Sequence, residues 1–188
     1  MFTREHFLNT TKPYDGADPN TDFEPSCCVC YKKTGQLPRC GRCKLVRYCS
    51  TDCQREHFPE HKKQCKVIKK LTDELQAQTT RMQSLEWGWQ SDPENVLRTQ
   101  VGRFWGIVET RDYCRARYRL YEAIADDFAY WGEQAEQWEI ALGHLLEIMR
   151  LNRSDNMGLR DKVVVAHATF VYTRRWHSAT HARVWWEK

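Results

Sequence analysis

The sequence contains no run of eighteen apolar residues, so it predicts no membrane-spanning helix. Its first twenty residues lack the apolar stretch of a secretory signal, which predicts an intracellular protein of the nucleus or the cytoplasm. Outside one short stretch the chain has a single cysteine, Cys114, which we expect to pack as a small apolar residue among helices. Disulfides do not persist in a reducing compartment, so the clustered cysteines indicate metal binding.

Acidic residues are scarce in the same stretch. Between Cys27 and Lys70 there are 12 lysines and arginines but only 3 aspartates and glutamates, whereas the whole 188-residue chain has a net charge of only +4. A small basic module is therefore joined to a mildly acidic remainder. Such a module binds phosphate weakly, but no helix carries a clear set of base-reading residues, so a weak nucleic-acid binder is only an alternative. Nine of these 12 residues form what we call the basic run: Lys32, Lys33, Arg39, Arg42, Lys44, Arg47, Lys62, Lys63 and Lys66.

Seven cysteines and one histidine of this stretch occur at the spacing of zinc ligands. Two C-x2-C pairs can each fold as a knuckle that directs two thiolates at one ion, and two later pairs, four residues apart, share one face of a helix. Eight ligands complete two tetrahedra with no open position, which predicts two structural zinc ions and disfavours a catalytic one. The predicted ligands are Cys27, Cys30, Cys40, Cys43, Cys49, Cys53, His61 and Cys65.

Cys28 and His57 are the rival ligands. Cys28 lies inside the first C-x2-C pair, and because a C-x-C pair cannot form the same knuckle, we interpret it as a partly exposed thiol that binds no metal. His57 lies four residues after Cys53 and four before His61. We favour His61 because it pairs with Cys65 at helical spacing.

The motif RYCSTDCQ, followed by HFPEHKKQC, resembles the MYND zinc finger, and every ligand position of that family is filled within about forty residues. The resemblance implies a cross-braced finger over residues 26–66 with interleaved ligands. It assigns Cys27, Cys30, Cys49 and Cys53 to one zinc ion, and Cys40, Cys43, His61 and Cys65 to the other.

The resemblance also implies a peptide-binding site. In the family, the positions of Gln54 and Phe58 help to line a shallow groove for proline-containing peptides of the PxLxP kind. An aromatic ring and an amide donor suit an extended proline-rich segment with free backbone carbonyls. The family usually has tryptophan at the position of Phe58, which keeps the aromatic surface but lacks the indole N–H.

The finger is too small to fold without help. Forty residues bury too little apolar surface to offset the entropy lost when the backbone is ordered. Structural zinc can supply on the order of 10–16 kcal/mol per site in small peptides. We therefore expect this segment to be unfolded without metal.

The rest of the chain predicts helices. Residues 1–25 read as a flexible arm, residues 67–91 as a connecting helix and linker, and residues 92–188 as a helical domain. Within that domain we expect one helix through Val108 that starts at Asp92 and Pro93, one after Thr110, one over Glu133–Leu151 and one from about Asn156.

The helical domain leaves two topologies open. The segment ALGHLLEIMRLNRSDN resembles the second helix of a tetratricopeptide repeat, and residues 93–165 resemble the helical part found beside this finger in some fungal proteins. A small irregular helical bundle is the alternative. The expected fold is thus a small zinc-stabilised α+β finger, cross-braced by two zinc ions, followed by an all-α domain.

These features predict an interaction module and not an enzyme. The finger would bind proline-containing segments of a protein partner, and the helical domain would offer a second surface in a regulatory or adaptor role. A lysine methyltransferase of the SET and MYND type is the alternative, but the chain lacks the asparagine-histidine-rich and glycine-rich cofactor segments of such enzymes. A ubiquitin-ligase finger is disfavoured because its histidine lies among the middle ligands, whereas here it is the seventh.

Overall fold

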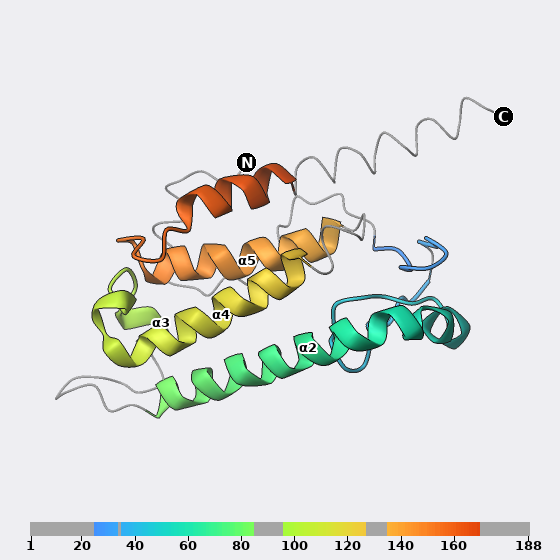
Figure 1. Cartoon of the computed structure of the whole chain (residues 1–188), viewed down its shortest axis with the longest axis horizontal. Helices are drawn as coiled ribbons and strands as arrows, with labels where there is room; N and C mark the ends of the chain where they lie inside the picture. Colours follow the sequence, from blue (N-terminus) through green and yellow to red (C-terminus); the bar gives the residue numbers. More distant parts are fainter. Residues whose placement is uncertain (1–24, 34, 85–95, 127–134, 170–188) are drawn as a thin grey trace.

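The structure is a computed structural model that describes residues 25–33, 35–84, 96–126 and 135–169 (Figure 1). The predicted N-terminal arm, the helix start at Asp92 and Pro93 and the C-terminal tail lie outside these residues. The helices are α2 (Thr51–Gln83), α3 (Val96–Thr99), α4 (Arg111–Ile124), α5 (Ala135–Leu151) and an unlabelled helix over residues 160–169. In chain order α2, α4, α5 and helix 160–169 lie side by side, and the cysteine-rich segment lies at the end where α2 begins (Figure 1).

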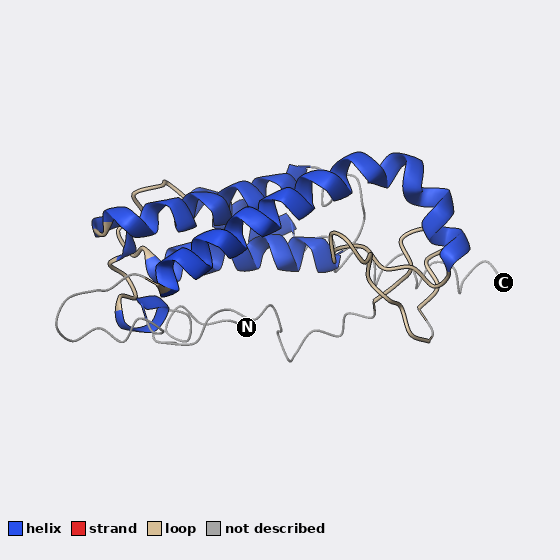
Figure 2. Cartoon of the chain, turned by 90° about the horizontal axis from the view of Figure 1, so that it is seen from below, coloured by secondary structure: helices blue, strands red, loops and turns tan. Residues whose placement is uncertain are grey.

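Helix α2 joins the cysteine-rich segment to the helical part without a break. Its N-cap is Ser50, whose Oγ accepts a hydrogen bond from the backbone N–H of Cys53 at 3.2 Å. The connecting helix, which we expect from the sequence to continue out of the cysteine cluster, does so: it forms one 33-residue helix with the last helix of the finger. Pro59 lies inside it, and a proline removes one backbone hydrogen bond and bends a helix. The long helix does change direction at its finger end (Figure 2).

The predicted helix from residue 92 to Val108 is wrong over most of the part that the structure describes. Only Val96–Thr99 is α-helical, and two 3₁₀ turns follow, Phe104–Gly106 and Val108–Thr110. Between α3 and the first of these turns, Gly102 has a φ of +83°, in the left-handed region that glycine adopts readily and that does not continue a helix. Thr110 makes no capping bond to α4; its hydroxyl instead donates to the carbonyls of Phe104 and Ile107 and holds the turns together.

Helices α4 and α5 carry the centre of the hydrophobic core. Both were predicted from apolar residues at spacings of three and four, and both are confirmed over the residues described. The predicted inner face of α4 is buried, and α5 buries its face between α4 and helix 160–169 (Figure 1). The buried residues of these faces are Tyr113, Ala116, Leu120 and Ile124 on α4, and Trp138, Ala141, Leu142, Leu145 and Ile148 on α5.

A buried ion pair ties α3 to α5. Glu147 and Arg150 lie one turn apart on α5 and are at most 1% exposed. Arg150 donates from Nε and Nη2 to the two carboxylate oxygens of Glu147 at 2.7 and 2.6 Å, and from Nη2 to the carbonyl of Leu97 at 3.2 Å. This fork pairs the two opposite charges inside the core, while the buried Nη1 of Arg150 has no hydrogen-bond partner among the described residues.

Other expectations about the fold are met only in their coarser form. The finger is followed by an all-helical region, but a tetratricopeptide-like repeat is not confirmed. The predicted β component of the finger is limited, among the residues described, to one antiparallel bridge between Arg39 and Arg47. None of the helices in the described part of the chain is long and apolar enough to cross a membrane.

Candidate metal centre

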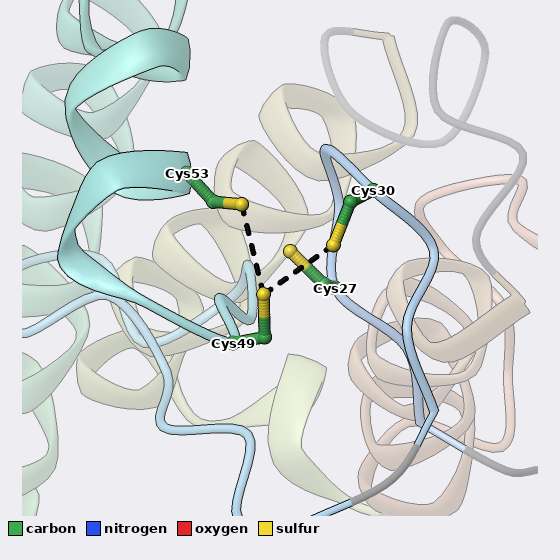
Figure 3. Close-up of side chains that lie close together, drawn as sticks. All are labelled: Cys27, Cys30, Cys49 and Cys53. Atoms are coloured by element: carbon green, nitrogen blue, oxygen red, sulfur yellow. Dashed lines mark hydrogen bonds between the residues drawn. The ribbon is translucent and has the colours of Figure 1, made fainter.

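The first group of four sulfur atoms brings together two parts of the finger. Cys27 and Cys30 lie in the first turn of the finger, and Cys49 and Cys53 lie where α2 begins (Figure 3). The four ligand atoms all lie within 4.8 Å of one another, with Cys30–Cys49 at 3.3 Å and Cys49–Cys53 at 3.6 Å. Sulfurs about 2.3 Å from one tetrahedral zinc lie roughly 3.8 Å apart, so this group fits a four-thiolate zinc site.

The second group combines a knuckle with one face of α2. A tight turn, in which the backbone N–H of Lys44 donates to the carbonyl of Cys40 at 3.0 Å, places Cys40 beside Cys43. His61 and Cys65 come from successive turns of α2. Cys40 and Cys65 sulfurs are 3.7 Å apart, and the Cys43 sulfur is 3.6 Å from Nε2 of His61. All four residues are buried, which suits a closed structural site.

The protonation properties of these groups also suit a cation. Burial raises the pKa of the Cys27 thiol, but backbone N–H groups of Cys30 and Val29 stabilise its thiolate and lower the pKa to about 6. Hydrogen bonding with Cys30 and Cys53 raises the pKa of Cys49 to about 12, because so many sulfurs crowd together. A divalent cation relieves that crowding and holds all four as thiolates.

His61 is held in the neutral form that can ligate a metal. Burial, with a smaller contribution from nearby His57, lowers the pKa of His61 to about 4. The chain thus has two zinc-binding clusters, one of four cysteines and one of three cysteines and a histidine, which confirms the predicted pair of zinc ions.

Neither rival ligand lies in these groups. Cys28 Sγ is 3.4 Å from Nδ1 of His57, and the Tyr48 hydroxyl is 3.1 Å from the same nitrogen. Burial, followed by repulsion from Cys27, raises the pKa of Cys28 to about 12, so it stays a protonated thiol. The His57 ring instead stacks on the His61 ring with centroids 5.3 Å apart. His57 therefore packs behind the second group and does not enter it.

A polar contact between the finger and α5 was not foreseen from the sequence. Glu136 accepts hydrogen bonds from Nε of Arg47 at 3.1 and 2.9 Å and from Nη2 at 2.8 Å, and it also pairs with Arg39. Its neighbour Gln137 donates from Nε2 to the carbonyl of Leu45 at 2.9 Å. We call Arg39, Leu45, Arg47, Glu136 and Gln137 the finger clamp. Two of the arginines in the predicted basic run thus bind a carboxylate of the chain itself.

The two residues of the implied peptide groove lie on the exposed side of α2. Gln54 and Phe58 are one helical turn apart, and the Phe58 side chain is 50% exposed. The ammonium of Lys62 lies 5.9 Å from the centroid of the Phe58 ring. The aromatic surface is therefore open to a partner and has a positive charge beside it.

Comparison with known proteins places the finger in a family. The family model described as the MYND finger matches residues 27–65, so the chain contains a MYND finger. The mouse histone-lysine N-methyltransferase Smyd1 is 43% identical over 143 residues, which cover 71% of this chain and 29% of that protein. The histone-lysine N-methyltransferase ASHR1 of Arabidopsis thaliana is 36% identical over 79 residues, covering 39% and 16%. No solved structure matches the chain.

The prediction that the chain is not an enzyme is contradicted by these relatives. They are named lysine methyltransferases, and the similarity to the mouse protein extends well beyond the finger. The chain spans less than a third of the length of these relatives. The absence of the asparagine-histidine-rich and glycine-rich cofactor segments from a chain of this length is therefore no argument against enzymatic activity.

Proposed function

We propose that residues Cys27, Cys30, Cys49 and Cys53 bind one zinc ion, and that Cys40, Cys43, His61 and Cys65 bind the other, so that the metals fold a protein-interaction surface. The observation that carries this proposal is the convergence of eight ligand atoms into two compact groups. Both groups are complete with protein ligands, so the zinc ions would act as structural cross-braces.

The surface so folded would dock an extended, proline-containing segment of a partner protein on Gln54 and Phe58. A proline ring packs well on an exposed aromatic side chain, and the Gln54 amide can donate to a free backbone carbonyl of the partner. Lys62, next to the Phe58 ring, would favour a partner segment with an acidic residue nearby. Helix 160–169 and the outer faces of the other helices would form a second contact surface.

Fluorescence anisotropy with a labelled peptide of PxLxP type tests this proposal on the zinc-loaded chain. We expect Phe58→Ala to weaken binding about tenfold, as loss of an aromatic anchor does, and Phe58→Trp to preserve or strengthen it. Val67→Ala is the matched control, because Val67 is also an exposed apolar residue of α2. Equal affinities for the native chain and the Phe58→Ala variant would show that docking does not use this surface.

The similarity to named methyltransferases favours a second proposal, that this finger works within a lysine-methylating protein. Its docking surface would then hold a substrate protein near a methyl-transferring site. Transfer of tritium from labelled S-adenosylmethionine to lysine-containing histone peptides by the chain tests it. Incorporation that depends on the chain supports the proposal, and none above the no-protein background shows that the methyl-transferring site is not carried by this chain alone.

A further inference from the structure

The finger clamp connects both metal clusters to one carboxylate. Arg39 directly precedes Cys40 of the second cluster, and Arg47 lies two residues before Cys49 of the first. The two arginine residues face each other in the antiparallel bridge of the finger. Around this bridge the backbone N–H of Cys40 donates to the carbonyl of Val46 at 2.7 Å, and that of Tyr48 donates to the carbonyl of Pro38 at 3.1 Å. The position of the arginines is thus tied to the position of the ligands.

Two guanidinium groups side by side repel each other unless an anion lies between them. Glu136 supplies that anion from the first turn of α5, where its own charge also interacts favourably with the helix dipole. The Glu136 side chain is only 9% exposed, and Arg47 contacts both of its oxygens, so water cannot easily replace it.

Gln137 adds a second attachment on the same turn. The residue is 1% exposed, and its amide nitrogen donates to the carbonyl of Leu45, which lies between Cys43 and Arg47. A buried carbonyl without this donor would be left unsatisfied. The first turn of α5 therefore supplies the hydrogen-bond donor for a buried backbone carbonyl of the finger.

We infer that Glu136 is a positioning residue of the metal centre: through Arg39 and Arg47 it fixes the two ligand-bearing segments that meet in the bridge of the finger, so that retention of zinc depends on α5. The inference rests on the proposed zinc ligands. It extends the metal site to a residue about 70 positions after the last ligand, outside the MYND finger match at residues 27–65.

The rate at which the intact chain releases zinc to a chromogenic chelator tests the inference. We expect Glu136→Gln to release zinc on the order of tenfold faster, because a charge-assisted contact to both arginines is lost. Glu109→Gln is the matched control, since Glu109 is exposed and lies in the turns at the opposite end of the molecule from the finger (Figure 1). Release at the native rate by Glu136→Gln would overturn the inference.

Two further measurements separate positioning from simple loss of folding. In the cobalt-substituted Glu136→Gln chain, the thiolate-to-cobalt absorption bands should keep their wavelengths, because the ligands are unchanged, yet bleach faster with chelator. Glu136→Gln/Arg47→Gln should release zinc no faster than the worse single variant, whereas additive effects would show that the residues act separately. If Glu136→Gln does not fold, Arg47→Lys decides: we expect an intermediate rate, and a native rate counts against the inference.

Failure of this inference is distinguishable from failure of the proposed zinc ligands. Metal analysis of the unmodified chain comes first, and fewer than two bound zinc ions would remove the premise. Two ions that are released equally fast from the native and Glu136→Gln chains would leave the ligands intact and remove only the role of α5.

Discussion

At the scale of single residues, Cys28 and Cys30 are chemically alike and two positions apart, yet only Cys30 lies in a metal cluster. We expect Cys30→Ser to lose one of the two zinc ions, because a hydroxyl is a poor replacement for a thiolate ligand. Cys28→Ser should keep both, since Cys28 contacts His57 instead. Metal analysis after gel filtration measures the difference, and zinc loss from Cys28→Ser would show that Cys28 is a ligand.

His144 on α5 gives a pH dependence to stability that is separate from the metals. Burial, with a smaller contribution from the Arg117 guanidinium 3.4 Å away, lowers the pKa of His144 to about 3. In the unfolded chain its pKa is about 6.5, so below that pH the unfolded state takes up a proton that the folded state does not. The contribution of neutral His144 to the free energy of unfolding is therefore present above pH 6.5 and is lost as the pH falls towards 3.

Urea unfolding of the native chain and of His144→Gln at pH 7.5 and pH 5.5 checks this dependence. We expect the native chain to lose about 1.4 kcal/mol more than the variant between the two values, from one pH unit below the unfolded pKa. Comparing the two proteins cancels the common effect of acid on the zinc sites. Equal losses would mean that His144 is protonated in the folded chain.

Residue-level chemistry explains which parts of the metal centre could be predicted. Zinc restricts both the residue type and the local spacing of its ligands, so the eight residues of the two clusters could be predicted from the sequence. Glu136 was not, because its partners Arg39 and Arg47 are 97 and 89 residues away and its local surroundings are those of any first-turn acid. For the same reason, the sequence does not reveal that Arg39 and Arg47 of the basic run are paired with a carboxylate of the chain itself.

At the scale of elements, the connection from α3 to α4 is the part where periodicity misled. Val96, Leu97, Val101 and Phe104 fit helical spacing, but α3 ends at Thr99, the backbone turns at Gly102, and Phe104 reaches the core from a 3₁₀ turn. In α4 and α5 the same reasoning succeeded: α4 has no glycine, and Gly143 lies within the continuous helix of α5 and is not among the glycines with positive φ. Conformation at one glycine therefore outweighed a pattern of several apolar residues.

Gly102→Ala tests how strongly that turn is fixed. A Cβ at this position would adopt an unfavourable positive φ and would lie 2.9 Å from the side chain of Arg153. We expect a loss of about 1–2 kcal/mol in the free energy of unfolding, measured by denaturant titration. Gly106→Ala is the control, since nothing lies within 4 Å of its Cβ position and its φ is not in the left-handed region. A variant as stable as the native chain would indicate that the turn relaxes freely.

At the scale of the whole molecule, the finger and the helices share both α2 and the finger clamp. Removal of zinc should therefore unfold the finger and also lower the melting temperature of the remaining helices, by about 5 °C or more for each kcal/mol lost. Circular dichroism at 222 nm during heating, with and without chelator, measures the effect. A helical transition at the same temperature in both conditions would show that the two parts are energetically independent.

The arrangement of the helices relative to the finger could not be read from the sequence. Alternating helical segments predicted an all-α region, but the packing of α2 on α4 and of α4 on α5 depends on contacts between distant positions. The helical spacing after Cys65 does predict a helix that continues out of the finger, and α2 runs for another 17 residues beyond residue 66.

The unbroken course of α2 has a geometric consequence for the docking surface. A helix rises about 1.5 Å and rotates about 100° per residue, so a single residue inserted after Cys65 would swing Phe58 and both metal clusters roughly a quarter turn around the axis of α2. The finger would then face away from the first turn of α5. The length of α2 therefore sets the direction in which the proposed docking surface faces relative to the other helices, and only insertions or deletions of whole helical turns would preserve that direction.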